Sequence, residues 1–577
     1  MPTKRAPDTE YSCPLSASDC PNNNPRVYLP VTESPGYHQT SMHCRALSIG
    51  SLPHQPKLLL DYLHSYENVS AFYQHKPALD SILQVARTPD FPSHRRRDVT
   101  GILRQQNLLL GSGPATLANL DRLENGAVSV VSGQQTGLFG GPAYAVYKAI
   151  AAVRIAKELT DQGVEAVPVF WMATEDHDLD EVRHVSFFHE GKLVKFELPA
   201  GVGNGAPVGR IPLGPEIEPL QSSAAQLLGE ANSEIAQILR DGYHPQETYG
   251  SAFGKMFARL LIDRGLILLD PLDLRLHQIA EPVLSNAIEQ RDLLERELLD
   301  RGEALEKAGY AAQVKVTSRS TALFYISRDG RQAVTSNAGK FASGQKSWTK
   351  ADLLAAIHSE PESFSPNALL RPVVQDFLLP TVAYIGGPAE ISYFAQSEVL
   401  YRNLLGRMPV ILPRAGFTLV DTKAQRLLKQ YGLEVEDVWS GPQELRKRIS
   451  KARVPENISA LLVENGSEIK RRLQQWSEAV SIVDPTLKDA VDTAQQKIAY
   501  QTEKLQEKIG RALDTKLNVL AAHEEFLSNL LYPDKTLQSR ELCFLPFAAR
   551  WGQQGFEEIE RHSGIKNIGS HFIIPVP

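Results

Sequence analysis

The sequence predicts an α/β fold with a doubly wound parallel sheet, followed by a helical C-terminal region. The run Ala166–Met172 (AVPVFWM) is apolar throughout, which is typical of a strand buried on both faces of a parallel sheet. Before it, an apolar run, a glycine-rich turn and a helical pattern follow one another, as in a βα unit. After about residue 422 the pattern changes to long charged helices with a regular apolar stripe.

Length and composition restrict the class of protein. The chain has 577 residues, too many for one hydrophobic core, so we expect at least two domains. Hydrophobic residues make up 42% and charged residues 22%, as in ordinary soluble proteins. The net charge of −6 lacks the basic excess of nucleic-acid binders, and no run approaches the roughly 18 apolar residues that span a membrane. The N-terminus also lacks the apolar core of a secretory signal, so we expect a cytoplasmic protein without nucleic-acid or membrane partners.

Residues 1–45 are rich in Pro, Ser, Asn and Thr without apolar periodicity, which predicts a disordered tail. Met42 precedes the first foldable pattern and is an alternative start of translation. The four cysteines form no CxxC pair and predict neither a disulfide framework nor a zinc ribbon; they are Cys13, Cys20, Cys44 and Cys543. A metal or redox pair of Cys13 and Cys20 is a minor alternative.

The first candidate site is a glycine-rich turn, SGQQTGLFGG, between a strand at Ala127–Val131 and a helix at Pro142–Leu159. Backbone N–H groups and the positive end of a helix dipole at such a turn can bind an anion. The turn is neither GxGxxG nor a Walker loop, and the glycines could serve backbone conformation alone. The candidate anion-binding residues are Ser132, Gly133, Gln134, Gln135, Gly137, Gly141 and Tyr144.

The second candidate site is an ionisable cluster that follows the buried strand Ala166–Met172; its members are Glu175, Asp176, His177 and Asp178. Ligands bind at the carboxyl ends of strands in open α/β sheets. Strand alternation would place Glu175 with His177 on one side and the two aspartates on the other. The cluster could act as a general base, orient an amine or bind sugar hydroxyls, and we assign no metal to it. The alternative is a loop capped by acids around a satisfied histidine.

The third candidate site is the segment TVAYIGGPAE, a strand that breaks into Gly-Gly-Pro before a helix; its candidates are Tyr384, Gly386, Gly387 and Glu390. Upstream, Asn367 and Arg371 lie four residues apart and share a face with Gln375. Arg371 is suited to bind a carboxylate or phosphate, although surface solvation explains these residues equally well.

The remaining pattern predicts core strands at 266–269, 322–326, 381–385 and 410–412, a returning strand at Phe572–Val576, and helices at 251–263, 282–308, 458–480 and 487–531. The last helix carries an apolar stripe formed by Leu487, Val491, Ala494, Ile498, Leu505, Ile509, Leu513, Leu517 and Leu520. This stripe predicts either a helical hairpin that packs on its own domain or the seam of a dimer.

Long blocks of the sequence resemble one known family. VVSGQQTGLFGGPAYAVYKAIAAVRIAKEL, VPVFWMATEDHDLDEVRHVSF, ALLRPVVQDFLLPTVAYIGGPAEISYFAQ and LQSRE are similar to the bacillithiol biosynthesis cysteine-adding enzymes, the cysteine ligases. The resemblance extends from about Leu52 to the C-terminus.

The resemblance implies a Rossmann-like core at 46–421 with connecting-peptide insertions at about 184–250 and 300–365. It also implies a helical coiled-coil domain at 422–535 that promotes homodimers, before residues 536–577 return to the core. The implied reaction joins the carboxyl group of L-cysteine to the amine of glucosaminyl malate, the final step of bacillithiol biosynthesis. A nucleotide site beside the coiled coil makes ATP or ADP an expected cofactor. The HIGH and KMSKS motifs of class I synthetases are absent, which argues against direct adenylate chemistry.

We hypothesise that His177, with Asp176 or Asp178, accepts a proton from the amine or orients it. The Gly133–Gly141 turn would bind an anionic group, and Arg371 and the Gly386–Glu390 loop would complete the pocket. Two other functions compete with this one: a metal-dependent hydrolase of an amino-sugar amide, and a non-catalytic scaffold built on the coiled coil.

Overall fold

A computed structural model describes residues 44–577 except 88–90, 200–204, 230–232, 329, 453, 455 and 515–518. The predicted tail, the alternative start at Met42 and the pair of Cys13 and Cys20 lie outside the described residues, apart from the tail's last two positions. There the prediction is wrong, because Arg45 already begins strand β1 (Arg45–Ser48). In the described part of the chain, no helix is both long enough and apolar enough to cross a membrane.

The predicted doubly wound sheet is present and has five parallel strands. Their order is β13 (Val410–Pro413), β12 (Thr381–Gly386), β2 (Val128–Gln134), β3 (Ala166–Met172) and β6 (Ile267–Leu269). The chain runs from β2 outward through β3 to β6 and later from β12 to β13, so the topology reverses between β2 and β12. All seven residues of β3 are buried, as their apolar character predicts.

The strand predicted at Ala322–Ile326 exists, but its assignment to the core sheet is wrong. It forms β7 (Ser320–Ser327) of a separate antiparallel sheet that includes β8 (Gly330–Asn337), β9 (Lys340–Ser343), β10 (Lys346–Trp348) and β11 (Phe364–Pro366). Buried and partly exposed residues alternate along β7, as expected for a sheet with one solvated face. A two-stranded hairpin, β4 (His184–His189) and β5 (Lys192–Glu197), lies in the other predicted insertion.

One predicted helix is divided in the structure, and another is described only in part. The segment 282–308 lies in α10 (Leu274–Glu289) and α11 (Arg291–Lys307), which separate at Gln290. The segment 487–531 lies in α19 (Leu487–Asp514) and α20 (Val519–Leu531), on either side of positions outside the described residues. The helix predicted at 251–263 is α9 (Tyr249–Leu260).

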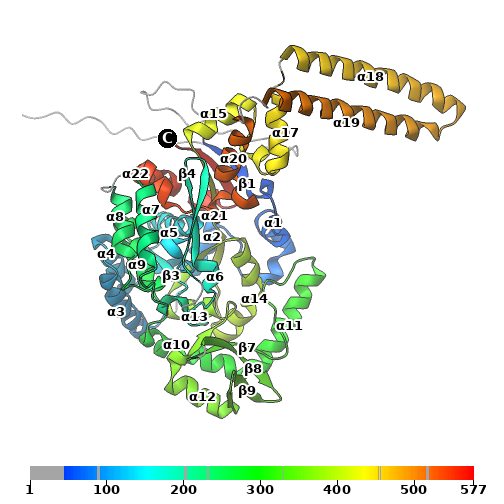
Figure 1. Ribbon diagram of the computed structural model, residues 1–577. Helices are drawn as coiled ribbons and strands as arrows, with labels where there is room; N and C mark the ends of the chain where they lie inside the picture. Colours follow the sequence, from blue (N-terminus) through cyan, green and yellow to red (C-terminus); the bar gives the residue numbers. More distant parts are fainter. Residues whose placement is uncertain are drawn as a thin grey trace, which may run out of the picture.

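Most of the other α-helices lie around the sheets, whereas α18 (Glu456–Val483) projects away from them (Figure 1). Apart from α18, these helices are α1 (Lys57–His64), α2 (Leu79–Ala86), α3 (Ser93–Leu109), α4 (Pro114–Glu124), α5 (Tyr144–Asp161), α6 (Leu179–Val182), α7 (Ile217–Leu227), α8 (Glu234–Gly242), α12 (Lys350–Ser359), α13 (Arg371–Leu378), α14 (Pro388–Leu404), α15 (Thr422–Tyr431), α16 (Val435–Val438), α17 (Pro442–Ala452), α21 (Gln538–Glu541) and α22 (Leu545–Arg561).

Helices α18 and α19 pack against each other as a long hairpin that projects away from the rest of the molecule (Figure 1). The hairpin leaves apolar side chains in solvent: Trp476 is 65% exposed, Leu505 48% and Ile498 36%. A helical hairpin is therefore present, but it projects from its domain (Figure 1) instead of packing along it as predicted, and a dimer seam along the stripe stays a prediction.

The returning strand predicted at Phe572–Val576 is β15 (Ser570–Pro575). It lies between β1, to which it is antiparallel, and β14 (Gly416–Val420), to which it is parallel. The segment that follows the hairpin thus contributes the middle strand of a sheet whose edge strands come from distant parts of the chain.

Candidate active site

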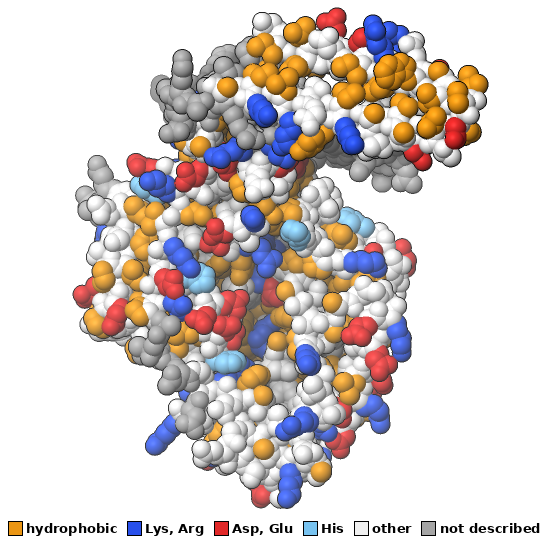
Figure 2. Space-filling model, turned by 45° about the vertical axis from the view of Figure 1, so that its right-hand side comes forward, with side chains coloured by type: hydrophobic (Ala, Val, Ile, Leu, Met, Phe, Trp, Pro, Cys, Tyr) orange, Lys and Arg blue, Asp and Glu red, His pale blue; other side chains and the backbone are white. Residues whose placement is uncertain are grey.

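A cavity of about 660 Å³ lies at the carboxyl ends of the parallel strands. Its walls come from the ends of β2, β3 and β12, the beginnings of α13 and α14, and the antiparallel sheet of the second insertion. This is the point where the strand order reverses, the usual ligand site of open α/β sheets. Figure 2 shows basic and acidic side chains gathered in a hollow of this face. The volume suits a small-molecule substrate.

The three predicted sites converge on this cavity, but not all of their residues reach it. The cavity is lined by Gly133, Gln134, Gln135, Tyr144, Glu175, Asp176, Asn367, Arg371, Tyr384, Gly387 and Glu390. Six predicted residues lie outside the lining: Ser132, Gly137, Gly141, His177, Asp178 and Gly386. Of these, Ser132 ties two strands together by donating a hydrogen bond of 2.8 Å to the carbonyl of Ile385, and the carbonyl of Gly386 accepts one of 3.0 Å from Arg414 N.

The second half of the glycine-rich turn is buried in the protein instead of open to a ligand. The Gly140 N–H donates to the Tyr243 hydroxyl over 3.1 Å, and that hydroxyl donates to the Gly137 carbonyl over 3.0 Å. Gly141 has a φ of 68°, a conformation that favours glycine. At Gly133 the reason for glycine is proximity, because a Cβ there would lie 2.6 Å from the Trp171 carbonyl oxygen. Only the first half, Gly133–Gln135, faces the cavity.

The acidic cluster does not continue the strand alternation that the sequence predicts. Strand β3 ends at Met172, and the chain then turns, so Asp176 and His177 come together with Asp176 Oδ1 3.5 Å from His177 Nδ1. Asp176 accepts hydrogen bonds of 2.7 Å from the side chain of Gln135 and from His177 N. Asp178 caps α6 by accepting from Glu181 N at 3.2 Å, which explains why it lies away from the cavity.

His177 is poorly placed to act as a base in this geometry. Its Nδ1 lies 3.2 Å from the Arg331 guanidinium. Because arginine only donates hydrogen bonds, this nitrogen acts as the acceptor, and a neutral ring then carries its proton on Nε2. The lone pair that would take up a proton is thus engaged.

Glu175 is the better-placed proton acceptor. It is 7% exposed, lines the cavity, and its Oε1 lies 3.4 Å from Nε2 of the buried His277. Burial, with a smaller contribution from Asp270, raises the pKa of Glu175 to about 7, although Arg331 opposes the shift. A carboxyl group with this pKa exchanges protons near neutral pH, which is the property of a general acid or base.

Lys148 and Glu390 form a buried ion pair at the cavity wall. Lys148 also donates hydrogen bonds of 3.0 Å to the Gly133 carbonyl and to Gln134 Oε1. Glu390 accepts from the Tyr384 hydroxyl at 2.5 Å and from Gly387 N at 2.8 Å. Burial lowers the pKa of Lys148, and the neighbouring Glu390 carboxylate opposes that shift. The pair joins α5 to the start of α14.

Arg371 is held at the first turn of α13 by neutral partners. It donates to the Tyr393 hydroxyl at 2.9 Å and to Gln375 Oε1 at 3.0 Å, and Asn367 caps the turn before it by accepting from Leu369 N and Leu370 N. No described carboxylate bonds to this guanidinium, which leaves its charge available to an anionic ligand.

Two buried donors in the cavity wall have no hydrogen-bond partner among the described residues: Arg414 Nε and Trp171 Nε1. Leaving a buried donor unpaired costs about 1–3 kcal/mol, so an acceptor brought within reach of either nitrogen would stabilise the site. Burial and the neighbouring Arg540 lower the pKa of Arg414 to about 10, and a bound anion would relieve this repulsion between cations.

Several residues of the site were not predicted from the sequence: Lys148, Trp171, Lys315, Arg319, Arg331, Arg414 and Arg540. For Lys148 a signal existed, because it lies four residues after Tyr144 on the apolar face of its helix. Arg331 and Arg540 reach the cavity from the second insertion and from the C-terminal segment, and local pattern carries no signal for such long-range contacts.

Comparisons with known proteins agree with this architecture. Residues 42–415 match the family described as "Bacillithiol biosynthesis BshC, N-terminal Rossmann-like domain", and residues 417–567 match "Bacillithiol biosynthesis BshC, C-terminal coiled-coil domain". Relatives named "Putative cysteine ligase BshC" include a protein of Koribacter versatilis, 41% identical over 88% of this chain and 95% of the relative. Another, from Solibacter usitatus, is 37% identical over 89% and 96%, and one from Salinibacter ruber is 31% identical over 90% and 96%. The chain therefore belongs to the bacillithiol biosynthesis BshC family.

Proposed function

We propose that this protein is a ligase that joins L-cysteine to glucosaminyl malate through an amide bond, the final step of bacillithiol biosynthesis. The observation that carries the proposal is a cavity lined by seven basic and four acidic residues, one of which, Glu175, has a pKa raised to about 7. Such a cavity combines binding of an anionic substrate with acceptance of a proton. The names of the relatives support the cysteine substrate.

The malate part of the substrate carries carboxylates, which match the basic wall of the cavity. Arg371 and Arg414 lie around the ends of β2 and β12. Tyr393 and Gln375 hold Arg371, and the Arg414 guanidinium donates a hydrogen bond of 3.1 Å to the Ala415 carbonyl. Charge-assisted hydrogen bonds from arginine to carboxylates are short and directional, so they would orient the substrate as well as bind it. We infer that Arg371 and Arg414 hold the malate group, because the three N–H donors of Lys148 are already bonded to Gly133, Gln134 and Glu390.

The amine of the glucosamine must lose a proton before it attacks the cysteine carboxyl carbon. We assign this proton to a carboxylate oxygen of Glu175, whose pKa, raised by burial to about 7, suits proton exchange near neutral pH. Asp176 and His177 then act as positioning residues, because they join Gln135 and Arg331 to the loop that carries Glu175.

Amide formation from a carboxylate also needs activation, which ATP supplies when bound. The basic residues of the cavity fit phosphate as well as carboxylate groups. The residues of this chain would bind and orient the substrates and exclude water. We propose ATP as the cosubstrate, with ADP and inorganic phosphate as its products, so that the carboxyl oxygen displaced by the amine leaves with the phosphate.

A metal-dependent hydrolase is less consistent with the geometry of the acidic cluster. Asp178 caps a helix, and Asp176 is committed to Gln135 and to the backbone of His177. A non-catalytic scaffold would not require the two unpaired donors in the cavity wall.

The test is mass spectrometry of the purified protein incubated with glucosaminyl malate and L-cysteine, with and without magnesium and ATP. We expect bacillithiol only when ATP is present. Separately prepared bacillithiol, incubated with the protein under the same conditions, controls for hydrolysis. Consumption of bacillithiol that stops after chelation and returns when metal is added would support the hydrolase instead. A mixture in which every substrate remains unchanged under all conditions would contradict the proposal.

A further inference from the structure

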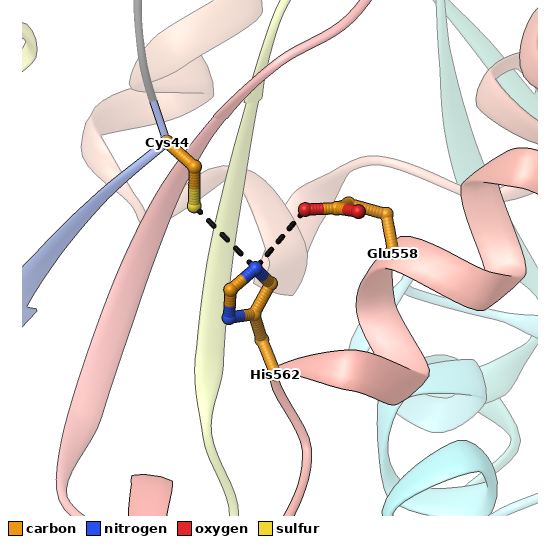
Figure 3. A group of neighbouring side chains, drawn as sticks. All are labelled: Cys44, Glu558 and His562. Atoms are coloured by element: carbon orange, nitrogen blue, oxygen red, sulfur yellow. Dashed lines mark hydrogen bonds and ion pairs between the residues drawn. The ribbon is translucent and has the colours of Figure 1, made fainter. Parts of the chain in front are cut away.

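A second group of chemically reactive side chains lies away from the cavity, where the described chain begins. Cys44 directly precedes β1, Glu558 lies in the last turn of α22, and His562 follows that helix (Figure 3). The thiol, the carboxylate and the imidazole point toward one another, although Cys44 and His562 are separated by 518 positions in the sequence.

The spacing of the three donor atoms suits a metal ion. Cys44 Sγ lies 3.6 Å from His562 Nε2, and the same nitrogen lies 3.0 Å from Glu558 Oε1. All three atoms lie within 4.8 Å of one another. Around a tetrahedral zinc ion with Zn–S of about 2.3 Å and Zn–N of about 2.0 Å, sulfur and nitrogen would be separated by roughly 3.5 Å. The observed separation therefore needs little change to accept the ion.

Neighbouring groups hold two of the ligands in place. The ring of Phe572 on β15 lies 4.5 Å from the His562 imidazole, centroid to centroid. Arg561 pairs with Oε2 of Glu558 and leaves Oε1 for the cluster. Such outer contacts orient metal ligands in known sites.

The cluster borders a cavity of about 370 Å³ whose wall includes Cys44, Glu558 and Trp551. This opening leaves room for water at a fourth coordination position. From the donor set, its spacing and this opening, we propose that Cys44, Glu558 and His562 bind a Zn²⁺ ion. Thiolate, imidazole and carboxylate together are donors that zinc accepts, whereas magnesium and calcium require oxygen ligands.

A nucleophilic thiol is the competing interpretation, and the geometry disfavours it. In a catalytic Cys-His-acid arrangement the acid contacts one ring nitrogen and the thiol contacts the other. Here both the thiol and the carboxylate face Nε2, so no proton can pass along the ring from one to the other. Both atoms converge instead on a point beside this nitrogen, where a cation would lie. Bound there, the ion would fasten β1 to the end of α22.

The direct test uses the full chain with Cys13→Ser and Cys20→Ser, so that the remaining thiols are Cys44 and the buried Cys543. After chelation and dialysis, the protein is titrated with Zn²⁺ and, in parallel, with Co²⁺. We expect one zinc ion per chain, an upward shift of the unfolding temperature with zinc, and a thiolate-to-cobalt charge-transfer absorption band. Absence of this band in folded protein at saturating cobalt would overturn the proposal without any further variant.

Single substitutions then locate the ion. Cys44→Ser, His562→Ala and Glu558→Gln should each weaken zinc binding by at least about tenfold, since even loss of an outer partner costs about 10–100-fold. Glu557→Gln is the matched control, because Glu557 lines the same cavity but is not part of the cluster. Equal affinity in Glu558→Gln and Glu557→Gln, with both proteins folded, would exclude this ligand set. Neither result depends on the proposed ligase activity.

Discussion

The sheet-edge cavity and the α18–α19 hairpin distribute polar and apolar groups in opposite ways. In the cavity, charged side chains are buried and held by many hydrogen bonds, as Lys148 and Glu390 illustrate. On the hairpin, large apolar side chains such as Trp476 and Leu505 are exposed to solvent. Buried charges and exposed apolar side chains both cost free energy in a chain that has no bound ligand or partner.

The two regions therefore indicate different kinds of partner. Buried charges and unpaired donors are suited to a small polar ligand that enters the cavity. Exposed apolar residues along a helical hairpin are suited to a protein surface, for which a second copy of this chain is the expected partner. Changes in the cavity should thus affect chemistry and folding stability, whereas changes on the hairpin should affect association alone.

The largest effect is expected from Glu175→Gln, which keeps the shape of the side chain but removes the proton acceptor. Turnover should fall about 10²–10⁴-fold, the typical contribution of a general base. The wild-type rate should also rise with pH through about 7, as Glu175 loses its proton. Steady-state rates measured from bacillithiol formation provide the check. Asp178→Asn is the matched control, because Asp178 caps a helix outside the cavity; an equal loss in both variants would refute the assignment.

Lys148→Met should strongly destabilise the fold. The change leaves Glu390 buried without its cation, and breaking a buried pair in this way costs about 3–5 kcal/mol. Urea denaturation measures the loss of unfolding free energy. The double variant with Glu390→Gln should regain much of it, because it removes the uncompensated charge. A single variant as stable as the wild type would show that the pair is not buried in solution.

Glu175 should also make stability depend on pH. Its pKa in the folded protein, about 7, lies above the ordinary value of 4.5, so the folded state binds the proton more tightly. The resulting stabilisation is fully present below about pH 4.5 and is lost as the pH rises through about 7. Glu175→Gln should match the wild type near the lower pH and exceed its unfolding free energy by roughly 3 kcal/mol above pH 7. Denaturation of both proteins at several pH values measures this difference in unfolding free energy. A difference that shrinks as the pH rises would contradict the prediction.

The smallest effect on the folded core is expected from Leu505→Glu on the hairpin. It should leave turnover per chain and the unfolding of the core unchanged, yet shift a dimer toward monomer, because the new charge lies in the apolar stripe. Gln496→Glu adds the same charge on another side of α19 and should not alter association. Sedimentation velocity compares the three proteins; a monomeric wild type would contradict the predicted dimer.

The sequence predicts the central parallel sheet well, because strands buried on both faces appear as short apolar runs such as Ala166–Met172. It also predicts which loops face the cavity, since these loops directly follow such strands. It fails for β7, because alternation identifies a strand but not the sheet that the strand joins. It fails for Arg331 and Arg540 for a related reason: their positions depend on contacts between segments that are distant along the chain.

The place of β15 also affects how the protein is made. Strands β1 and β14 are synthesised first, yet neither pairs with the other; both pair with β15, which comes last of the three. While the ribosome is still translating residues 421–569, these two edges lack their partner and could pair with other nascent chains. Arg540, a part of the cavity wall, is also still missing during most of this time. The nascent chain therefore acquires a protected sheet only after β15 has been synthesised, and a complete cavity only after Arg540 has been added.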